Sequence, residues 1–379
     1  MKQRMNELMN YVCKLTASEK KQIIAQIMEM MHDPQNTNSQ SVSCNEMVSA
    51  KRNLDRPDCP HCKAEAERGM IVKRGFKKGV QRYSCKACGK IFVSTTNTAF
   101  QGTRKSSEAW CHFIDLTISG ASLVICAEEC GIAYQTAFNW RHKVLNVFRS
   151  FRDETKMAGR VEVDEMFIPL SYKGNHVKGS IGSKRIRLPG EENYLPRKSF
   201  QRGTDNRPTS HAERACVFCM VANANAFYGG VPGVGQITAT MLDITLAKHV
   251  TKAQAKVLTD KNKVTVKYLK EKGYAYRSLA SNVSDNSNNH RPEIVDGDHL
   301  QHVNVMHQQI RKFLRPYCGV ASKYLDNYIS LFVWLKNTQY VRRRKEVKNL
   351  SLSRASSYGT YIRSKDIYAF PAIPSCSVS

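Results

Sequence analysis

The sequence predicts a multidomain α/β protein, in which small N-terminal modules precede a larger domain built on a mixed sheet. Two observations lead to this fold class. Two Cys-x-x-Cys pairs lie close together before residue 95, and from residue 160 onward strand-like apolar segments are followed by an alternation of strands and helices. That order is typical of a sheet with both antiparallel and parallel neighbours. At 379 residues the chain is long enough for two or three domains with sizeable cores.

The charge of the chain narrows the choice of partners. Lys and Arg number 58 against 32 Asp and Glu, a formal net charge of +26, which favours nucleic acid or an anionic membrane surface. No apolar run approaches membrane-spanning length, and residues 1–15 lack the apolar core of a signal peptide. We therefore expect double-stranded DNA as the partner, no membrane, and a bacterial cytoplasmic, nucleoid-associated protein.

The thirteen cysteines do not indicate disulfides. Cys216 and Cys219 lie in an apolar run and are interpreted as buried strand thiols, with a redox pair as the lesser alternative. A reducing compartment fits this usage best.

The first module is predicted to be helical and spans residues 1–33. Thr16 and Glu19 have the spacing of a capping box, and Ile23, Ile27 and Met31 follow on one helical face. Residues 34–54 are rich in polar side chains and are predicted to form a linker.

A zinc ribbon is predicted for residues 55–95. Its four thiols belong to two knuckles separated by twenty-two residues, Cys59, Cys62, Cys85 and Cys88. This spacing suits a tetrahedral cage around structural Zn2+. Residues 82–84 and 90–93 read as the flanking strands. The alternative is a chance clustering of reduced thiols.

Residues 106–152 show a helical pattern that breaks at Gly131, and a helix, a glycine-containing turn and a second helix predict a DNA-binding helix-turn-helix. The second helix has an apolar stripe that includes Trp140 and Phe148. Its exposed side is expected to carry the DNA-contacting side chains Gln135, Asn139, Arg141, His142 and Lys143. The alternative is an ordinary helical hairpin with a solvated polar face.

The α/β domain is predicted for residues 160–337. Strands are expected at about 160–168, 215–222, 236–242, 255–260 and 274–280, and helices at about 261–271, 298–315 and 322–335. The glycine-rich segment 230–235 lacks the Lys-Ser/Thr of a phosphate-binding loop and is read as a hairpin turn. Residues 170–214 form a basic insert, and residues 338–379 form a basic tail expected to be loosely ordered.

Two acidic residues stand out by position. Asp164 lies inside the first strand and Asp260 ends the fourth. Carboxylates from distant parts of a chain hold the paired divalent ions that phosphodiester chemistry requires. The alternative for each is a loop cap or simple exposure. A third ligand is sought on helix 298–315, where His307 lies at the centre of the apolar stripe and Asn304 at its edge. A core histidine without a ligand role remains the alternative there.

Together these features resemble a bacterial insertion-sequence transposase of the zinc-ribbon group related to the eukaryotic Merlin elements, over about residues 55–337. The shared features, in chain order, are the four-cysteine ribbon, the helix-turn-helix pattern, Val-Glu-Val-Asp-Glu, Leu-Thr-Asp, His-Val-Asn-Val-Met-His and Lys-Tyr-Leu-Asp-Asn-Tyr. The resemblance implies an RNase H-like catalytic domain of the DDE type that uses Mg2+ or Mn2+. Asp164 and Asp260 match its first two acids. His307 matches the position where many relatives carry Glu, and Lys312 is the nearest match for the basic residue that follows.

The function expected from these observations is a DNA transposase. It would bind the terminal inverted repeats and target DNA as a homo-oligomer, and would cleave and transfer strands in a metal-dependent reaction. The alternatives are a catalytically inactive zinc-ribbon DNA-binding regulator and a DNA nuclease without strand transfer.

Overall fold

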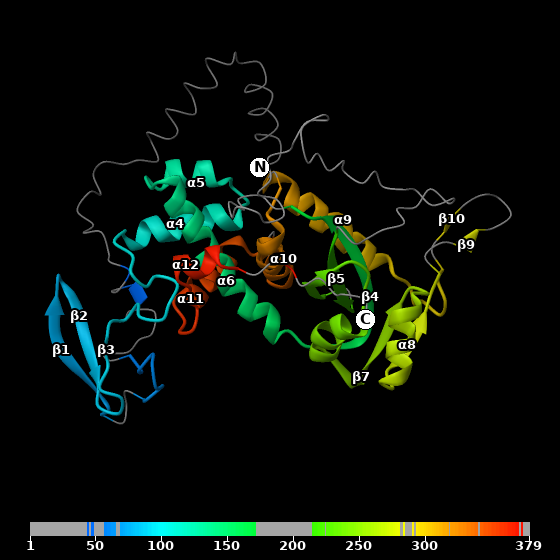
Figure 1. Cartoon of the computed structure of the whole chain (residues 1–379), viewed down its shortest axis with the longest axis horizontal. Helices are drawn as coiled ribbons and strands as arrows, with labels where there is room; N and C mark the ends of the chain where they lie inside the picture. Colours follow the sequence, from blue (N-terminus) through cyan, green and yellow to red (C-terminus); the bar gives the residue numbers. More distant parts are fainter. Residues whose placement is uncertain are drawn as a thin grey trace, which may run out of the picture. The chain divides into compact units, whose positions relative to one another are not determined.

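The structure is a computed structural model, drawn in Figure 1. It describes residues 44, 47–48, 57–65, 69–171, 214–223, 225–280, 283–284, 290–291, 293–317, 319–339, 342–370 and 373. All of these belong to one compact unit, Ser43–Ser379. The predicted helical segment 1–33, most of the linker and almost all of the basic insert lie outside the described residues. No helix in the described part of the chain has the length and apolar character to cross a membrane.

The cysteine-rich region forms a small three-stranded antiparallel sheet in the order β1-β2-β3. Its strands are β1 (Ile71–Lys77), β2 (Val80–Cys85) and β3 (Ile91–Phe92). Lys78 and Gly79 join β1 to β2 and both have positive φ (51° and 75°), as a two-residue hairpin turn requires. Residues 82–84 lie in β2 as predicted, whereas the strand predicted at 90–93 is shorter.

Three helices follow, α4 (Ser107–Ile118), α5 (Leu123–Glu129) and α6 (Tyr134–Glu154). Ser106 and Ser122 cap α4 and α5 by accepting the backbone N–H of Ala109 and Ile125. Gly131 lies between α5 and α6 with φ +56°, which a side chain would strain. The predicted break in the helical pattern is therefore confirmed.

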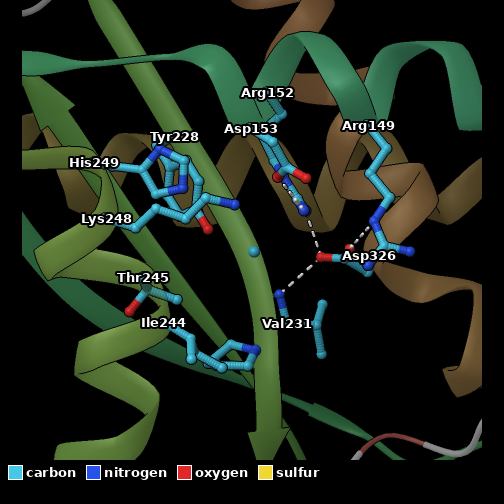
Figure 2. Close-up of a pocket in the computed structure, with 12 residues that line it drawn as sticks. Arg149, Arg152, Asp153, Tyr228, Val231, Ile244, Thr245, Lys248, His249 and Asp326 are labelled. Carbon is cyan, nitrogen blue, oxygen red and sulfur yellow. Dashed lines mark hydrogen bonds and ion pairs between the residues drawn. The ribbon is translucent and has the colours of Figure 1, made fainter. Parts of the chain in front are cut away.

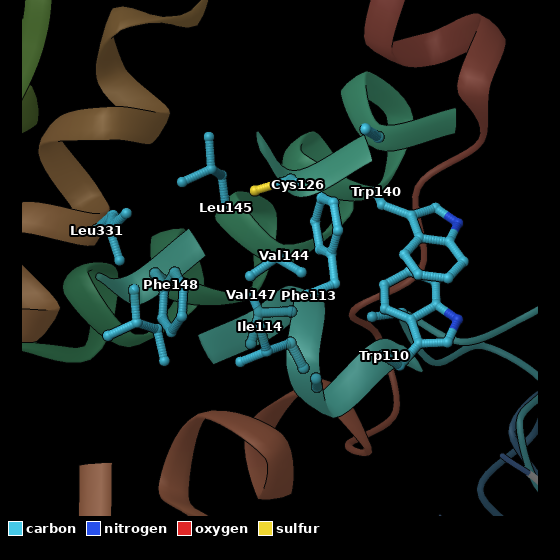
Figure 3. Packing of buried hydrophobic residues seen from close by; sticks show 14 of the residues in the cluster. Trp110, Phe113, Ile114, Cys126, Trp140, Val144, Leu145, Val147, Phe148 and Leu331 are labelled. Atoms are coloured by element: carbon cyan, nitrogen blue, oxygen red, sulfur yellow. The ribbon is translucent and has the colours of Figure 1, made fainter. Parts of the chain in front are cut away.

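Aromatic rings form the centre of this helical region (Figure 3). Trp110 of α4 and Trp140 of α6 stack with ring centroids 3.8 Å apart, and Phe113 meets Trp140 edge-on at 5.3 Å. These side chains are almost fully buried. Such ring pairs contribute stabilisation beyond the apolar area that they bury.

The larger domain contains a five-stranded sheet in the order β6-β5-β4-β7-β8. The strands are β4 (Met157–Pro169), β5 (Arg214–Ala222), β6 (Ala226–Val234), β7 (Val250–Thr259) and β8 (Ala275–Ser278). Strand β5 is antiparallel to both β6 and β4, whereas β4, β7 and β8 run parallel to one another. The prediction of a mixed sheet is confirmed, and Cys216 and Cys219 are buried strand thiols as expected.

Helices cover both faces of this sheet. Alternate β4 residues such as Val161 and Val163 pack toward α7 (Ala239–Leu242), the π-helical turn η2 (Asp243–Ala247) and α8 (Lys263–Glu271). The other face packs against α9 (Gln301–Leu314) and α10 (Ser322–Asn337). The remaining short elements are β9 (Val283–Ser284), β10 (His290–Arg291) and η3 (Arg315–Tyr317).

Two predictions about the elements of this region are wrong. The strand expected at 236–242 is β6, which lies earlier and contains most of the glycine-rich segment that was read as a turn. Close packing explains Gly229, which directly precedes that segment: a Cβ there would lie 2.9 Å from Ile329 of α10. The basic tail is also not loosely ordered throughout: it forms α11 (Arg344–Ala355) and α12 (Ser364–Tyr368), and Trp334 donates to Ser351 at 3.1 Å.

Helix α10 packs against both α6 and β6. Asp326 of α10 accepts hydrogen bonds from the guanidinium of Arg152 in α6 and, at 3.0 Å, from the backbone N–H of Val231 in β6 (Figure 2). Burial alone would raise the pKa of Asp326, but Arg152 holds it below its usual range. A polar cavity of about 170 Å³ lies beside this contact. One ionised carboxylate thus joins the helical region to the sheet.

Candidate functional site

The four predicted zinc-ligating thiols converge. Their sulfur atoms all lie within 4.8 Å of one another. Cys59 Sγ is 3.7 Å from Cys88 Sγ, and Cys62 Sγ is 3.6 Å from Cys85 Sγ. A disulfide would need about 2.05 Å, whereas a tetrahedral ion with bonds of about 2.3 Å places its ligand sulfurs about 3.8 Å apart. The spacing fits a metal cage and excludes disulfides between these pairs.

The two knuckles share one backbone design. Cys59 O accepts the N–H of Lys63 at 3.0 Å, and Cys85 O accepts the N–H of Gly89 at 2.9 Å. Lys63 and Gly89 both have positive φ, 61° and 70°. This turn places the two thiols of each pair on the same side of the chain. The four-cysteine cluster could therefore hold zinc, as the spacing of the cysteines predicts.

The predicted acids lie side by side at one end of the larger sheet. Strands β4 and β7 are parallel, with Glu162 aligned to Leu258. Asp164 lies two residues after Glu162, and Asp260 lies two residues after Leu258. Because the strands run in the same direction, the two carboxylates reach the same edge of the sheet. The sequence separated them by ninety-five residues, and the strand register brings them together.

Burial and mutual repulsion perturb these acids. Burial, and then the charges of Glu165 and Asp260, raise the pKa of Asp164 to about 8. Burial and Asp260 raise the pKa of Glu165 to about 7, and burial raises the pKa of Asp260. Carboxylates held close together without a cation resist ionisation. A divalent cation bound beside these carboxylates would lessen this penalty.

His307 of α9 lies against this cluster. Its Nδ1 is 3.9 Å from Oδ2 of Asp164, too far for a hydrogen bond but wide enough for a shared ion with bonds of about 2.0–2.2 Å. Its Nε2 has no hydrogen-bond partner among the described residues. Burial, helped by the cation of Arg311, lowers the pKa of His307 to about 4. The ring is therefore neutral at neutral pH, the form that binds metals.

Three residues near the acids were not singled out by the sequence reasoning. Glu165 accepts a hydrogen bond from Asn262 Nδ2 at 2.7 Å, and Asn262 also caps α8. Arg311 lies one turn after His307 and affects its titration. Glu165 was hidden because alternate strand residues normally point to opposite faces. A search for polar residues just after each strand would have found Asn262, and a search one turn from His307 would have found Arg311.

Two other predicted site residues lie apart from this arrangement. Asn304 and Lys312 are both exposed on α9. Within the described part of the chain, no hydrogen bond or ion pair joins their side chains to the acids. Arg311 is exposed as well, but its positive charge acts on His307, which lies beside Asp164.

Of the five residues predicted to contact DNA, two are buried. Arg141 is 0% exposed and donates to the backbone O of Ala121 at 2.7 Å and to Cys126 Sγ at 3.2 Å. His142 is 1% exposed, and burial lowers its pKa to about 3. The prediction that both lie on the exposed side of the helix is wrong, because α6 is covered by α5 and also by α10.

The other three remain accessible. Gln135 is exposed and donates to the hydroxyl of Tyr368 in α12, which in turn donates to Asn139 at 3.0 Å. Lys143 is partly exposed. A cavity of about 450 Å³ beside Gln135 is lined mainly by aromatic side chains, including Phe138. A polar surface with an aromatic cavity remains at the N-terminal part of α6.

Comparison with known proteins adds one weak similarity. No protein-family model matches the chain. The chain is 25% identical over 163 residues to an uncharacterized protein in transposable element ISH50 of Halobacterium salinarum. The match covers 41% of this chain and 53% of that protein, so the chain spans about half the length of the curated relative it matches. The similarity therefore connects the chain with a protein of an insertion element.

Proposed function

We propose that this protein is a DDE-type DNA transposase of an insertion element, with an RNase H-like catalytic domain. The observation that carries the proposal is the placement of Asp164 inside β4 and of Asp260 directly after the adjacent parallel strand β7, with His307 beside Asp164. The strand order β6-β5-β4-β7-β8, with three antiparallel strands followed by parallel ones, supports the RNase H-like assignment. The weak similarity to an insertion-element protein points the same way.

In this proposal each residue of the acid cluster has a defined task. Asp164 and Asp260 bind the metals through carboxylate oxygens, and His307 contributes a neutral nitrogen. Asn262 holds Glu165 by a hydrogen bond of 2.7 Å and so fixes its carboxylate beside the other acids. Arg311 places a positive charge where a DNA phosphate would approach. Two divalent ions, Mg2+ or Mn2+, would supply activation of the attacking oxygen and stabilisation of the leaving oxygen.

DNA binding is assigned to the N-terminal modules. The exposed Gln135 and the partly exposed Asn139 and Lys143 on α6 can reach bases or phosphates. The zinc ribbon presents Lys and Arg side chains on β1 and β2, which suit phosphate contacts. Both ends of an element must be processed together, so a homo-oligomer on the terminal inverted repeats is part of the proposal.

The test uses the full chain with labelled duplexes that carry the inverted repeats flanking its coding region. Asp164→Asn should bind these ends with the parental affinity and leave them uncut, because an amide supplies no negative charge to a metal. The matched control is Asp296→Asn, a change at a 78% exposed aspartate, which should cut normally.

The products separate the proposed function from its alternatives. A transposase yields both nicked ends and ends joined to target DNA. Nicked products alone would indicate a nuclease. If the parental protein binds the ends but forms no product with Mg2+ or Mn2+, the protein is a DNA-binding regulator without catalytic activity.

A further inference from the structure

Glu162 is a buried acid on β4 that the proposed reaction does not use. It is 6% exposed and lies two residues before Asp164, on the same face of the strand. A carboxylate so deeply buried is costly unless it is paired and hydrogen-bonded. Its partners all lie at the start of α9.

The backbone at the start of α9 supplies one partner. The helix has no hydrogen bond from a capping side chain at its own N-cap, Leu300. Instead, Oε2 of Glu162 accepts the N–H of Val303 at 3.0 Å. This bond satisfies an otherwise unpaired helix N–H and fixes the orientation of the carboxylate. The other oxygen, Oε1, is left for the side chains of α9.

Two imidazoles point at that oxygen. Nδ1 of His302 lies 2.5 Å from Oε1, and Nδ1 of His299 lies 3.4 Å from it. The ligand atoms of the three residues all lie within 4.8 Å of one another. The side chains of His299 and His302 are 24% and 45% exposed, so the site is open to solvent on one side.

The contact with His299 is unusual in its hydrogen bonding. Its Nδ1 accepts the backbone N–H of Gln301 at 3.3 Å, which requires a lone pair on that nitrogen. Oε1 of Glu162 therefore faces a second acceptor at 3.4 Å with no proton between them. A cation that takes the Nδ1 lone pair in place of the Gln301 N–H, whose hydrogen bond is long at 3.3 Å, turns the contact with Glu162 from unfavourable to favourable.

We propose that Glu162, His299 and His302 form a second metal site, for a transition-metal ion of the zinc class. Two imidazoles and one carboxylate are a ligand set that such ions prefer over Mg2+. Tetrahedral coordination with bonds of about 2.0–2.1 Å places ligand atoms about 3.4 Å apart. The His299 contact has this spacing already, and His302 reaches it by withdrawing its exposed ring. Water completes the coordination.

The ion would join the first turn of α9 to β4. The same turn is also held by Asp298, which pairs with Lys256 at 2.5 Å and Arg277 at 3.0 Å. The helix is therefore attached without the ion, and the ion sets its position more tightly. Any effect on catalysis rests on the proposed function, because α9 carries His307; metal binding itself does not depend on it.

The test is a zinc count on the full-length protein, equilibrated with limiting Zn2+ and then freed of loosely held metal. The Asp164→Asn background keeps zinc out of the acid cluster. We expect about two zinc ions per chain, one of them in the four-cysteine cage, and about one in His302→Ala and in Glu162→Gln. The matched control is His112→Ala, which removes a surface histidine 3.5 Å from Glu129 and should keep both ions.

Cobalt substitution gives an independent readout. Co2+ in the four-cysteine cage produces strong thiolate charge-transfer absorption, and Co2+ at the second site adds weaker visible bands that should vanish in His302→Ala and in Glu162→Gln but not in His112→Ala. The retained thiolate absorption reports that the four-cysteine cage of each variant is intact. A parental protein with only the thiolate-bound ion, or a His302→Ala protein that holds as much zinc as its parent, would overturn the proposal. These zinc counts do not depend on the proposed function, so a protein that cleaves no DNA should give the same counts.

Discussion

Asp164 has two acidic neighbours and little contact with solvent, and both conditions determine when its carboxylate is charged. Without a metal, the cluster of Asp164, Glu165 and Asp260 keeps protons that the unfolded chain would release at about pH 4. A metal bound there as proposed would compete with protons for the same oxygens, so the stability of the metal-free and metal-bound proteins should depend on pH in different ways.

This competition gives a stability prediction. The folded pKa values of Asp164 and Glu165, about 8 and about 7, are raised above their unfolded values. Between about pH 4 and pH 8 the folded state holds more protons, so stability falls as pH rises through this window. We expect the Tm of protein whose only metal is zinc in the four-cysteine cage to fall between pH 5 and pH 8. Asp164→Asn should flatten that fall and Asp296→Asn should leave it unchanged. A parental Tm that rises over this range would contradict the burial of these acids.

His307 carries the sharpest prediction about the site. If its nitrogen binds the catalytic metal, His307→Ala should lower strand transfer on the order of 100-fold while circular dichroism stays parental. His307→Glu should keep part of the activity and favour Mg2+, whereas the parental protein should be faster with Mn2+, since imidazole suits transition ions. Asn304→Ala should be mild. If Asn304→Ala is the more damaging change, Asn304 is the ligand and His307 a core residue.

At the scale of single residues, the sequence was most informative where an acid interrupted apolar surroundings. Asp164 and Asp260 could be named because a strand rarely buries a carboxylate without a reason. Glu165 could not be identified as part of this cluster from the sequence, since its contact with Asn262 depends on where β7 ends. Glu162 was hidden for a similar reason: its partners lie about 140 residues away along the chain.

At the scale of elements, α6 shows the limit of predicting the exposed face of a helix from the spacing of its apolar residues. The apolar stripe with Trp140 and Phe148 correctly predicted one buried face. The opposite face was read as exposed because Arg141 and His142 are polar. A helix that is covered on two sides needs polar residues with internal partners, and these partners lie on other helices. The same limit explains why the helices of the C-terminal region were missed.

Arg141 therefore should act as a structural residue. Arg141→Ala removes hydrogen bonds to Ala121 and Cys126 and leaves a cavity, which we expect to cost about 2–3 kcal/mol in the free energy of unfolding. Gln135→Ala, at an exposed site on the same helix, should change that free energy by less than about 0.5 kcal/mol. Denaturant titration measures both. If the two variants were equally stable, Arg141 would not have this structural role and would again be a candidate for direct DNA contact.

At the scale of the whole molecule, the helical region and the sheet domain share α10. Its Trp334 ring lies 5.3 Å from Phe148 and 4.5 Å from Phe151, both on α6, while Ile329 of the same helix packs onto β6. Each motif was interpreted from its own residues, so the sequence suggested modules that fold separately. The shared core could not be predicted, since it depends on contacts between segments almost two hundred residues apart.

A truncation tests this shared core. A fragment of residues 1–155 keeps α4 to α6 but loses α10 and α11, so it exposes the face of α6 that carries Phe148. Burial of one large apolar side chain is worth roughly 1.5–3 kcal/mol, and several are lost at once. We expect the fragment to show less helix by circular dichroism and a lower Tm than a chain of residues 43–379. A fragment that melts like the longer chain would show that the helical region folds alone.

The carboxylate of Asp326 has a consequence for anyone who builds hybrid proteins from this one. A new helical region cannot simply be spliced on at the end of α6, because a transferred Arg152 would keep only its neighbour Asp153 as a counter-ion, or Asp326 would be left facing a foreign helix. A workable exchange must treat α6 and α10 as one inherited pair, although 167 residues separate Glu154 from Ser322 in the chain. The helical region and the sheet domain are thus transplanted together or not at all.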